Sequence, residues 1–184
     1  MESKTVKEMM IPLSDYATVQ QDATLFDAVQ ALKQAQNQFV RNRYQHRAVL
    51  VFDDKKQIVG KLAQLDVLKS LEPKYKGLDE LDNLALLHVD VDAIRNSMET
   101  YGLWQKPIDD ICRKAAAVKV RDIMEKTGKG EYIEEDETIN TAIHQMVVGQ
   151  KQSLLVTRGE KIVGILRLTD VFKQICDLME ACEI

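Results

Sequence analysis

The feature that most constrains the fold is an internal duplication of the chain. A short apolar run with one glycine, then a polar turn and an amphipathic stretch, occurs twice, at residues 57–68 and 161–172. In each copy an aspartate follows the glycine by six residues, as Asp66 follows Gly60 and Asp170 follows Gly164. Because a repeated sequence builds a repeated supersecondary unit, we expect two similar halves.

Three further blocks repeat in the same order. They pair residues 6–10 with 120–124, residues 22–29 with 136–143, and residues 48–51 with 153–156. The first two pairs are 114 residues apart and the third is 105 residues apart, so the first copy carries about nine extra residues before its third block. Four blocks in one order indicate a true repeat rather than a chance match.

Each copy has the same predicted secondary structure. Thr24 and Thr138 are suitable helix N-caps, and apolar residues follow each of them at helical spacing. Two β-rich runs joined by a tight turn come next, and an amphipathic helix ends the unit. A short extended piece precedes the whole, around Val19 in the first copy and Ile133 in the second. Neither copy has enough apolar faces to bury both sides of its small sheet, so the two units are expected to pack together as an α+β pair.

The repeats divide the chain into three parts. We place the first repeat at residues 1–71, the second at residues 120–184, and an unmatched segment at residues 72–119. Apolar residues recur in this segment at helical spacing around residues 78–88, 94–101 and 108–115. Pro107 suits the first turn of the last of these helices. The segment is therefore predicted to be a helical insertion, packed on the repeats or on a partner chain, and not a flexible linker.

Composition excludes several classes of protein. The net charge of −4 leaves no overall electrostatic footprint for nucleic acid, and no apolar run approaches the length needed to cross a membrane. The polar, mixed-charge start is unlike a secretory signal. Three cysteines without a Cys-x-x-Cys pair argue against a disulfide framework and favour a reducing, cytoplasmic environment.

Known catalytic motifs are also missing. The sequence has no phosphate-binding P-loop, no Gly-x-Ser-x-Gly, no dinucleotide-binding glycine fingerprint and no His-Glu-x-x-His, so we do not expect an enzyme. His88, Asp90 and Asp92 alternate, but they lie in a helical pattern, where alternate positions do not share a face. No metal site is predicted.

The duplicated unit, with Val-[Lys/Arg]-[Glu/Asp]-x-Met before it and Ile-Val-Gly-x-Leu…Asp inside it, resembles a tandem pair of CBS domains, the Bateman module. The match covers about two-thirds of the chain, and its strength comes from two full copies in order. The resemblance implies two β-α-β-β-α repeats packed as a pseudo-symmetric pair. It also implies dimerisation and binding of AMP, ADP, ATP or S-adenosylmethionine in clefts between the repeats.

The family's ligand motif is a glycine, then a threonine or serine three residues later, then an aspartate after three more. By this resemblance Asp66 and Asp170 would bind the ribose hydroxyls, and Lys61 and Ile165, after Gly60 and Gly164, would lie beside the base. Both aspartates also begin predicted helices, so capping is an alternative or additional role.

The chain departs from this motif at the hydroxyl position. Ala63 stands there in the first copy and Arg167 in the second. A lost hydrogen bond to a charged phosphate costs about 1.5–3 kcal/mol. Arg167 could compensate by binding phosphate, or it could point into solvent. The basic stretch at residues 38–47, which includes His46, could likewise supply cations to a polyphosphate or be a solvated loop.

Two hypotheses from different classes follow. The first is a regulatory module that senses an adenosyl nucleotide and passes the change to a homodimer or to a separate effector protein, with no role for nucleic acid or membrane. The second is a ligand-free scaffold that assembles through its repeats or its helical insertion.

Overall fold

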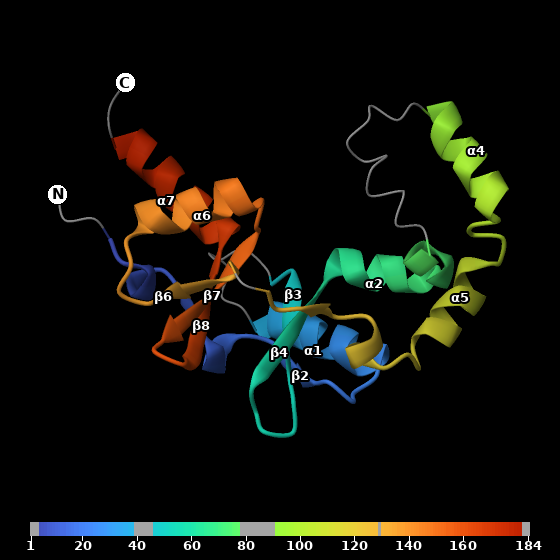
Figure 1. The fold of residues 1–184 in the computed structure, drawn as a ribbon, viewed down its shortest axis with the longest axis horizontal. Helices are drawn as coiled ribbons and strands as arrows, with labels where there is room; N and C mark the ends of the chain where they lie inside the picture. The colour runs from blue at the N-terminus through green and yellow to red at the C-terminus, as the bar shows by residue number, and fades with distance from the viewer. Residues whose placement is uncertain (1–3, 39–45, 78–90, 129, 182–184) are drawn as a thin grey trace.

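The computed structural model describes residues 4–38, 46–77, 91–128 and 130–181. It is an α+β fold of two four-stranded sheets that lie side by side, each covered by two helices, as predicted (Figure 1). The insertion lies at one side of the molecule, away from α6 and α7. The predicted helix at residues 78–88 lies outside the described residues, as do His88 and Asp90 of the alternating segment.

The first sheet contains three strands of the first repeat and one short strand from the segment that leads into the second repeat. Its order is β2-β3-β4-β5, with β2 (Thr18–Gln20), β3 (Ala48–Phe52), β4 (Ile58–Ala63) and β5 (Glu125–Lys126). Helices α1 (Leu25–Gln38) and α2 (Gln64–Leu71) pack on it. The predicted cap of α1 is confirmed: the Asp27 N–H donates to Thr24 Oγ1 at 3.2 Å, and the Thr24 N–H donates to the Asp27 carboxylate at 2.9 Å.

The second sheet repeats this arrangement. Its order is β1-β8-β7-β6, with β1 (Ile11–Pro12), β6 (Tyr132–Glu134), β7 (Ser153–Arg158) and β8 (Lys161–Arg167). Helices α6 (Ile139–Gly149) and α7 (Leu168–Ala181) cover it. Thr138 caps α6 by accepting a hydrogen bond from the Thr141 N–H at 3.2 Å, which confirms the predicted N-cap.

The segment that leads into each repeat packs on the other repeat. The 3₁₀ turn η1 (Val6–Glu8) and β1 join the second repeat, whereas η4 (Val120–Asp122) and β5 join the first. Equivalent hydrogen bonds hold the two segments: the Val6 N–H donates to Glu137 O and the Val120 N–H donates to Ala23 O, both at 2.9 Å. This exchange ties the repeats into one unit.

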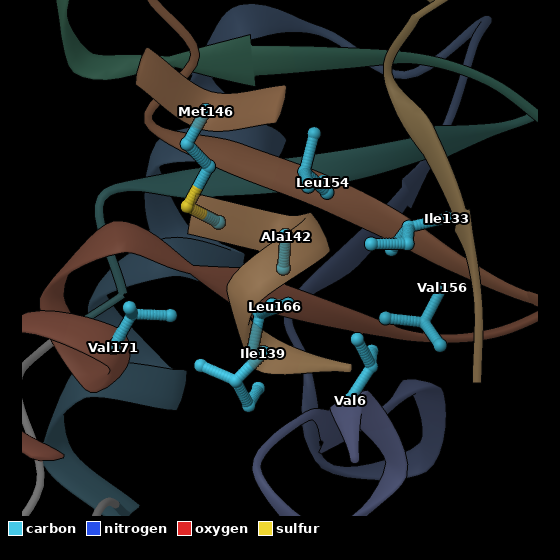
Figure 2. Close-up of a cluster of buried hydrophobic side chains, with 9 residues drawn as sticks. All are labelled: Val6, Ile133, Ile139, Ala142, Met146, Leu154, Val156, Leu166 and Val171. Carbon is cyan, nitrogen blue, oxygen red and sulfur yellow. The ribbon is translucent and has the colours of Figure 1, made fainter. Parts of the chain in front are cut away.

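Three apolar clusters form the core. One lies between α6, α7 and the second sheet, and includes Val6 from the exchanged segment (Figure 2). Another lies between α1, α2 and the first sheet and includes Val120. The third joins the opposite faces of the two sheets, where Leu50 of β3 packs with Leu155 of β7. The strands are therefore buried on both faces, which confirms that the two units pack together.

The described part of the insertion is helical, as expected. It contains η3 (Pro73–Gly77), α4 (Val91–Tyr101) and α5 (Ile108–Ala115), and Pro107 precedes the first turn of α5. Trp104 fastens the α4–α5 turn to the start of the insertion, directly after α2: its backbone N–H donates to the buried Glu72 carboxylate at 2.8 Å, and its Nε1–H donates to Tyr75 Oη at 2.9 Å. These contacts place η3 and the α4–α5 turn against the end of α2.

Candidate functional site

Two clefts occupy equivalent places in the two halves of the molecule. The Asp170 cleft, of about 220 Å³, lies between η1, β1 and α7; it is lined by Glu8, Met9, Met10, Ile11, Asp170, Lys173, Gln174 and Asp177. The Asp66 cleft, of about 260 Å³, lies between η4 and α2; it is lined by Asp66, Lys69, Ser70, Tyr75, Asp122, Ile123 and Met124. Each cleft thus combines a helix of one repeat with the leading segment exchanged from the other.

Of the seven residues proposed for ligand binding, only the two aspartates line these clefts. Gly60 and Lys61 lie on β4, and Gly164, Ile165 and Arg167 lie on β8, next to the clefts. The fold therefore brings each aspartate close to its own glycine strand, but it keeps the two sets at separate corners of the molecule.

The two glycines allow the exchanged strands to approach. A Cβ at Gly164 would lie 2.5 Å from the Ile11 carbonyl oxygen and 2.9 Å from Met10 Sδ. A Cβ at Gly60 would lie 2.8 Å from the Glu125 carbonyl oxygen and 2.8 Å from Met124 Sδ. No side chain fits at either point, so glycine has a structural reason at both positions whether or not a ligand binds.

Arg167 is held by Asp170 and does not extend into solvent. Its Nε–H donates to Asp170 Oδ2 at 2.6 Å and its Nη2–H donates to Oδ1 at 2.7 Å, so both carboxylate oxygens accept from one guanidinium. The Arg167 side chain is 6% exposed and that of Asp170 is 17% exposed. A short, bidentate and partly desolvated pair of this kind is among the stronger interactions in proteins. Both oxygens of the Asp170 carboxylate are thus already bound by a side chain of the protein itself.

Tyr16 and His46 lie close to this pair. Their rings meet edge to face, with centroids 4.3 Å apart. Burial, with the Arg167 charge adding to it, lowers the pKa of His46 to about 4, and burial raises the pKa of Tyr16 to about 12. His46 is fully buried and neutral at pH 7, so the prediction that the basic stretch is either a phosphate-binding or a solvated loop is wrong for this residue.

Asp66 is bound differently from Asp170. Its Oδ2 accepts the Ala63 N–H at 2.8 Å, which caps the start of α2. Burial raises the pKa of Asp66, against the lowering effect of that hydrogen bond. No ion pair to Asp66 occurs among the residues that the structure describes, which distinguishes it from Asp170. The capping role predicted from the sequence is confirmed here, whereas Asp170 is used mainly by Arg167.

Behind the Asp66 cleft lies a cluster of four charged side chains. Lys61 Nζ donates to Glu131 Oε1 at 3.2 Å, and Lys151 Nζ donates to the same oxygen at 2.7 Å. Glu125 pairs more loosely with both lysines, at 3.4 and 4.0 Å. Burial disfavours the Glu131 charge, yet the hydrogen bonds and charges of Lys151 and Lys61 outweigh burial and lower its pKa. Lys61 therefore neutralises a buried carboxylate and is not free to contact a base.

Neither this cluster nor the Tyr16–His46 contact was predicted from the sequence. The signal was available in the repeat alignment, because Lys61 aligns with Ile165 and Lys151 aligns with His46 at the spacings of 104 and 105 residues. Where one copy has a charged side chain and the aligned position of the other copy has an uncharged one, the two copies differ in chemistry.

Among residues 4–38, 46–77, 91–128 and 130–181, no group of three His, Cys, Asp or Glu side chains is placed to hold a metal ion. Within the same ranges, none of the helices is both long and apolar enough to span a bilayer.

Comparison with known proteins agrees with this architecture. The model of the CBS domain matches the chain twice, at residues 6–73 and 120–177. A search of curated proteins finds no significant match.

Solved structures similar to the chain are distant in sequence. One is CBSX2 in complex with AMP, at 17% identity and a TM-score of 0.59, with 95% of this chain and 97% of that chain covered. Another is a CBS domain-containing protein of unknown function from Bacillus anthracis, at 14% identity and a TM-score of 0.61, with 95% and 94% covered. A third, from Methanocaldococcus jannaschii, is longer: at 17% identity and a TM-score of 0.57, 95% of this chain matches 60% of that one. At these identities the likeness shows a shared fold.

Proposed function

Because the chain belongs to the CBS-domain family and carries two copies of the domain in tandem, we propose that it is a non-enzymatic regulatory module that binds an adenosyl nucleotide. The observation that carries this proposal is the pair of equivalent clefts, each with an aspartate at the first turn of a helix facing an exchanged segment. The AMP bound to CBSX2, which has the same fold, supports the choice of an adenosyl compound.

We assign the ligand to the Asp170 cleft. Met10 and Ile11 give it an apolar wall for the base, and Asp170 supplies a carboxylate that can accept hydrogen bonds from ribose hydroxyls. In the Asp66 cleft the position beside the base is Lys61, which is committed to Glu131. Placing a base there would separate a buried charge from its partner, which is costly.

Arg167 would act as a latch in this mechanism. A ribose can use Asp170 only after the guanidinium leaves it, so the free protein and the ligand-bound protein would differ in the position of Arg167. Arg167 lies on the same face of β8 as Ile165, directly beside the cleft that Asp170 lines. Once released, the guanidinium could bind a phosphate. Breaking the pair weakens binding, so we expect an affinity in the micromolar to millimolar range.

The charge around the cleft selects among adenosyl ligands. Glu8, Asp170 and Asp177 contribute three carboxylates, against the ammonium of Lys173 and the guanidinium of Arg167, so the cleft keeps a net negative charge. Negative walls repel a triphosphate and tolerate a ligand with little negative charge. We therefore expect AMP or the sulfonium compound S-adenosylmethionine to bind more tightly than ATP.

Titration calorimetry of the whole chain tests the proposal. We expect saturable heat with AMP or S-adenosylmethionine, weaker binding of ATP, and at least a tenfold loss of affinity in Asp170→Ala. Asp66→Ala is the matched control in the equivalent cleft, and its effect should be less than twofold. The absence of heat for every adenosyl compound at millimolar concentration would overturn the proposal, and a loss confined to Asp66→Ala would move the site to the other cleft.

We further propose that a homodimer reads the state of the cleft. Large apolar side chains are exposed on the helices that flank the two sheets; they include Phe26, Leu65, Leu68, Val147, Val148, Phe172 and Met179. Exposed apolar patches on such helices mark surfaces for association. Because Phe172 lies two residues after Asp170 on α7, a movement of Asp170 would shift Phe172 at this surface.

The ligand-free scaffold remains a second candidate, and one observation favours it. The Arg167–Asp170 pair already satisfies the carboxylate that the ligand would need. In that case assembly would use the insertion, where Ile94 is 50% exposed and Met98 is 39% exposed on α4. Sedimentation separates the two functions: Phe172→Asp should dissociate a dimer built on the flanking helices, whereas Ile94→Asp with Met98→Asp should dissociate one built on the insertion.

A further inference from the structure

The insertion and the end of α2 enclose a third pocket, next to the Asp66 cleft. It has a volume of about 280 Å³ and lies between the end of α2, η3, the α4–α5 turn and α5. This volume is near the lower end of the range of about 300–1,000 Å³ for small-molecule sites, so it suits a single ring or a short chain. The adenosyl proposal makes no use of this pocket.

One side of the pocket is apolar and fixed. Leu71 of α2 and Ile111 and Ala115 of α5 line it, and Ala115 also belongs to the core of the first repeat. The opposite side is held by the Glu72 carboxylate, which accepts from the Trp104 N–H at 2.8 Å and the Lys74 N–H at 3.3 Å. The pocket is therefore formed before any ligand enters, which lowers the entropic cost of binding.

Three lysines surround the opening. Lys74 Nζ donates to the carbonyl oxygens of Tyr101 and Gly102, at 3.3 and 2.6 Å, and so remains close to the pocket. Lys106 and Lys114 also line it, and neither forms an ion pair or a side-chain hydrogen bond with another of the described residues. Glu72, which supplies a carboxylate to the lining, already accepts hydrogen bonds from two backbone N–H groups. Like charges around one concavity repel one another until an anion neutralises them.

We propose that this pocket binds a small amphipathic anion, an apolar ring or short chain that carries one carboxylate or phosphate group. The apolar body would lie on Leu71, Ile111 and Ala115, and the anionic group would accept hydrogen bonds from Lys106 and Lys114. Ser70 lines both this pocket and the Asp66 cleft, so the ligand would touch the turn of α2 that separates the two.

Nuclear magnetic resonance of the ¹⁵N-labelled full chain tests the site with phenyl phosphate and, in a second arm, benzoate. We expect saturable shifts confined to backbone amides of residues 70–74, 102–106 and 111–115, and no saturation with uncharged benzyl alcohol. The arm that binds more tightly identifies the preferred anionic group. AMP, titrated separately, should shift amides of α7 and β1 and leave these three segments unchanged.

Variants test the role of the lysines. The double variant Lys106→Ala with Lys114→Ala should weaken phenyl phosphate binding at least tenfold, because both charged hydrogen bonds are removed. The matched control, Lys33→Ala with Lys55→Ala, removes the same charge from exposed positions outside the pocket and should change affinity less than twofold. All four side chains are exposed, so both variants should fold, which circular dichroism checks.

Three results would overturn the inference. They are no saturable shift with either anion at 10 mM, equal binding of benzyl alcohol, and equal affinity in the two double variants.

Discussion

The residues beside the two clefts, which we call the Asp66 corner and the Asp170 corner, occupy equivalent backbone positions but differ in charge. At the Asp66 corner the equivalent positions hold Glu125, Glu131, Lys151 and Lys61; at the Asp170 corner they hold Ile11, Ala17, His46 and Ile165. The first set forms a cluster of ion pairs, and the second is buried, with Ile11 and Ile165 in the apolar cluster that joins the sheets. Four positions that differ between the copies therefore give one corner a charged network and the other four uncharged, buried side chains.

This difference shows which residues determine the fold and which determine the chemistry. The glycine, the aspartate and the alternating apolar residues of the strands recur in both copies, and the same sheet order and the same exchanged segment result. The chemistry of the two clefts depends instead on a few side chains that differ between the copies. Such separation of scaffold and site is common in proteins.

The largest expected effect concerns the glycine strands. Gly164→Ala would place a methyl group 2.5 Å from the Ile11 carbonyl oxygen, a backbone atom in the core between the sheets. We expect the free energy of unfolding to fall by about 3 kcal/mol, because the backbone at this point has no room to relax. Gly60→Ala meets Glu125, at the end of the short β5, and should be less destabilising. Urea denaturation of both variants measures the difference.

Gly128→Ala is the matched control for this pair. A Cβ at Gly128 would meet no atom within 4 Å, so its effect should stay within about 0.5 kcal/mol. If Gly60→Ala is the more destabilising of the two, the apolar corner is not the more tightly packed one.

Much of this architecture could be predicted from the repeat. The α+β class, the helices capped by Thr24 and Thr138, the paired units and the helical insertion follow from local periodicity and capping rules. The exchange of the leading segments could not be predicted in this way. The segments around Val6 and Val120 are so alike in sequence that each could pack on its own repeat or on the other one. Only packing decides between the two arrangements.

Less of the candidate site than of the fold could be predicted from the sequence. Position and motif identified Asp66 and Asp170 as equivalent, and both line clefts. The motif could not show that Arg167 would take both oxygens of Asp170, because that depends on the burial of a strand residue beside a helix start. The Lys61–Glu131 pair was equally hidden, since its partners are 70 residues apart.

The second prediction uses pH to distinguish the corners. His46 titrates at about 4 when folded and near 6.5 when unfolded, so the unfolded chain binds a proton that the folded chain does not. Its contribution to stability is complete above about pH 6.5 and is lost as the pH falls toward 4. We expect the free energy of unfolding to drop by about 2 kcal/mol between pH 7 and pH 4.5 through this residue. His46→Phe should remove that drop and keep the ring contact with Tyr16.

Glu131→Gln is the corresponding change at the charged corner. The pKa of Glu131 is lowered from 4.5 by folding, so its contribution is lost only as the pH falls below that value. The two variants should therefore flatten different parts of the stability profile, His46→Phe above pH 4.5 and Glu131→Gln below it. A His46→Phe profile that parallels the parent protein throughout would show that the imidazole is not held neutral by the Asp170 corner.

The smallest expected effect is a difference in the free energy of unfolding that the N-caps of α1 and α6 contribute. Thr24 and Asp27 satisfy each other's backbone N–H groups, and the carboxylate also favours the helix N-terminus. Thr138 satisfies only the Thr141 N–H, because Thr141 Oγ1 contacts the Thr138 hydroxyl at 3.0 Å and not its backbone. Thr24→Ala should thus cost about 1.5 kcal/mol and Thr138→Ala about 0.5–1 kcal/mol, measured by thermal unfolding. Thr141→Asp would give the second repeat the box of the first and should stabilise it by about 0.5 kcal/mol. Equal costs for the two alanine variants would mean that the reciprocal carboxylate adds nothing, and that the repeats differ only at their clefts.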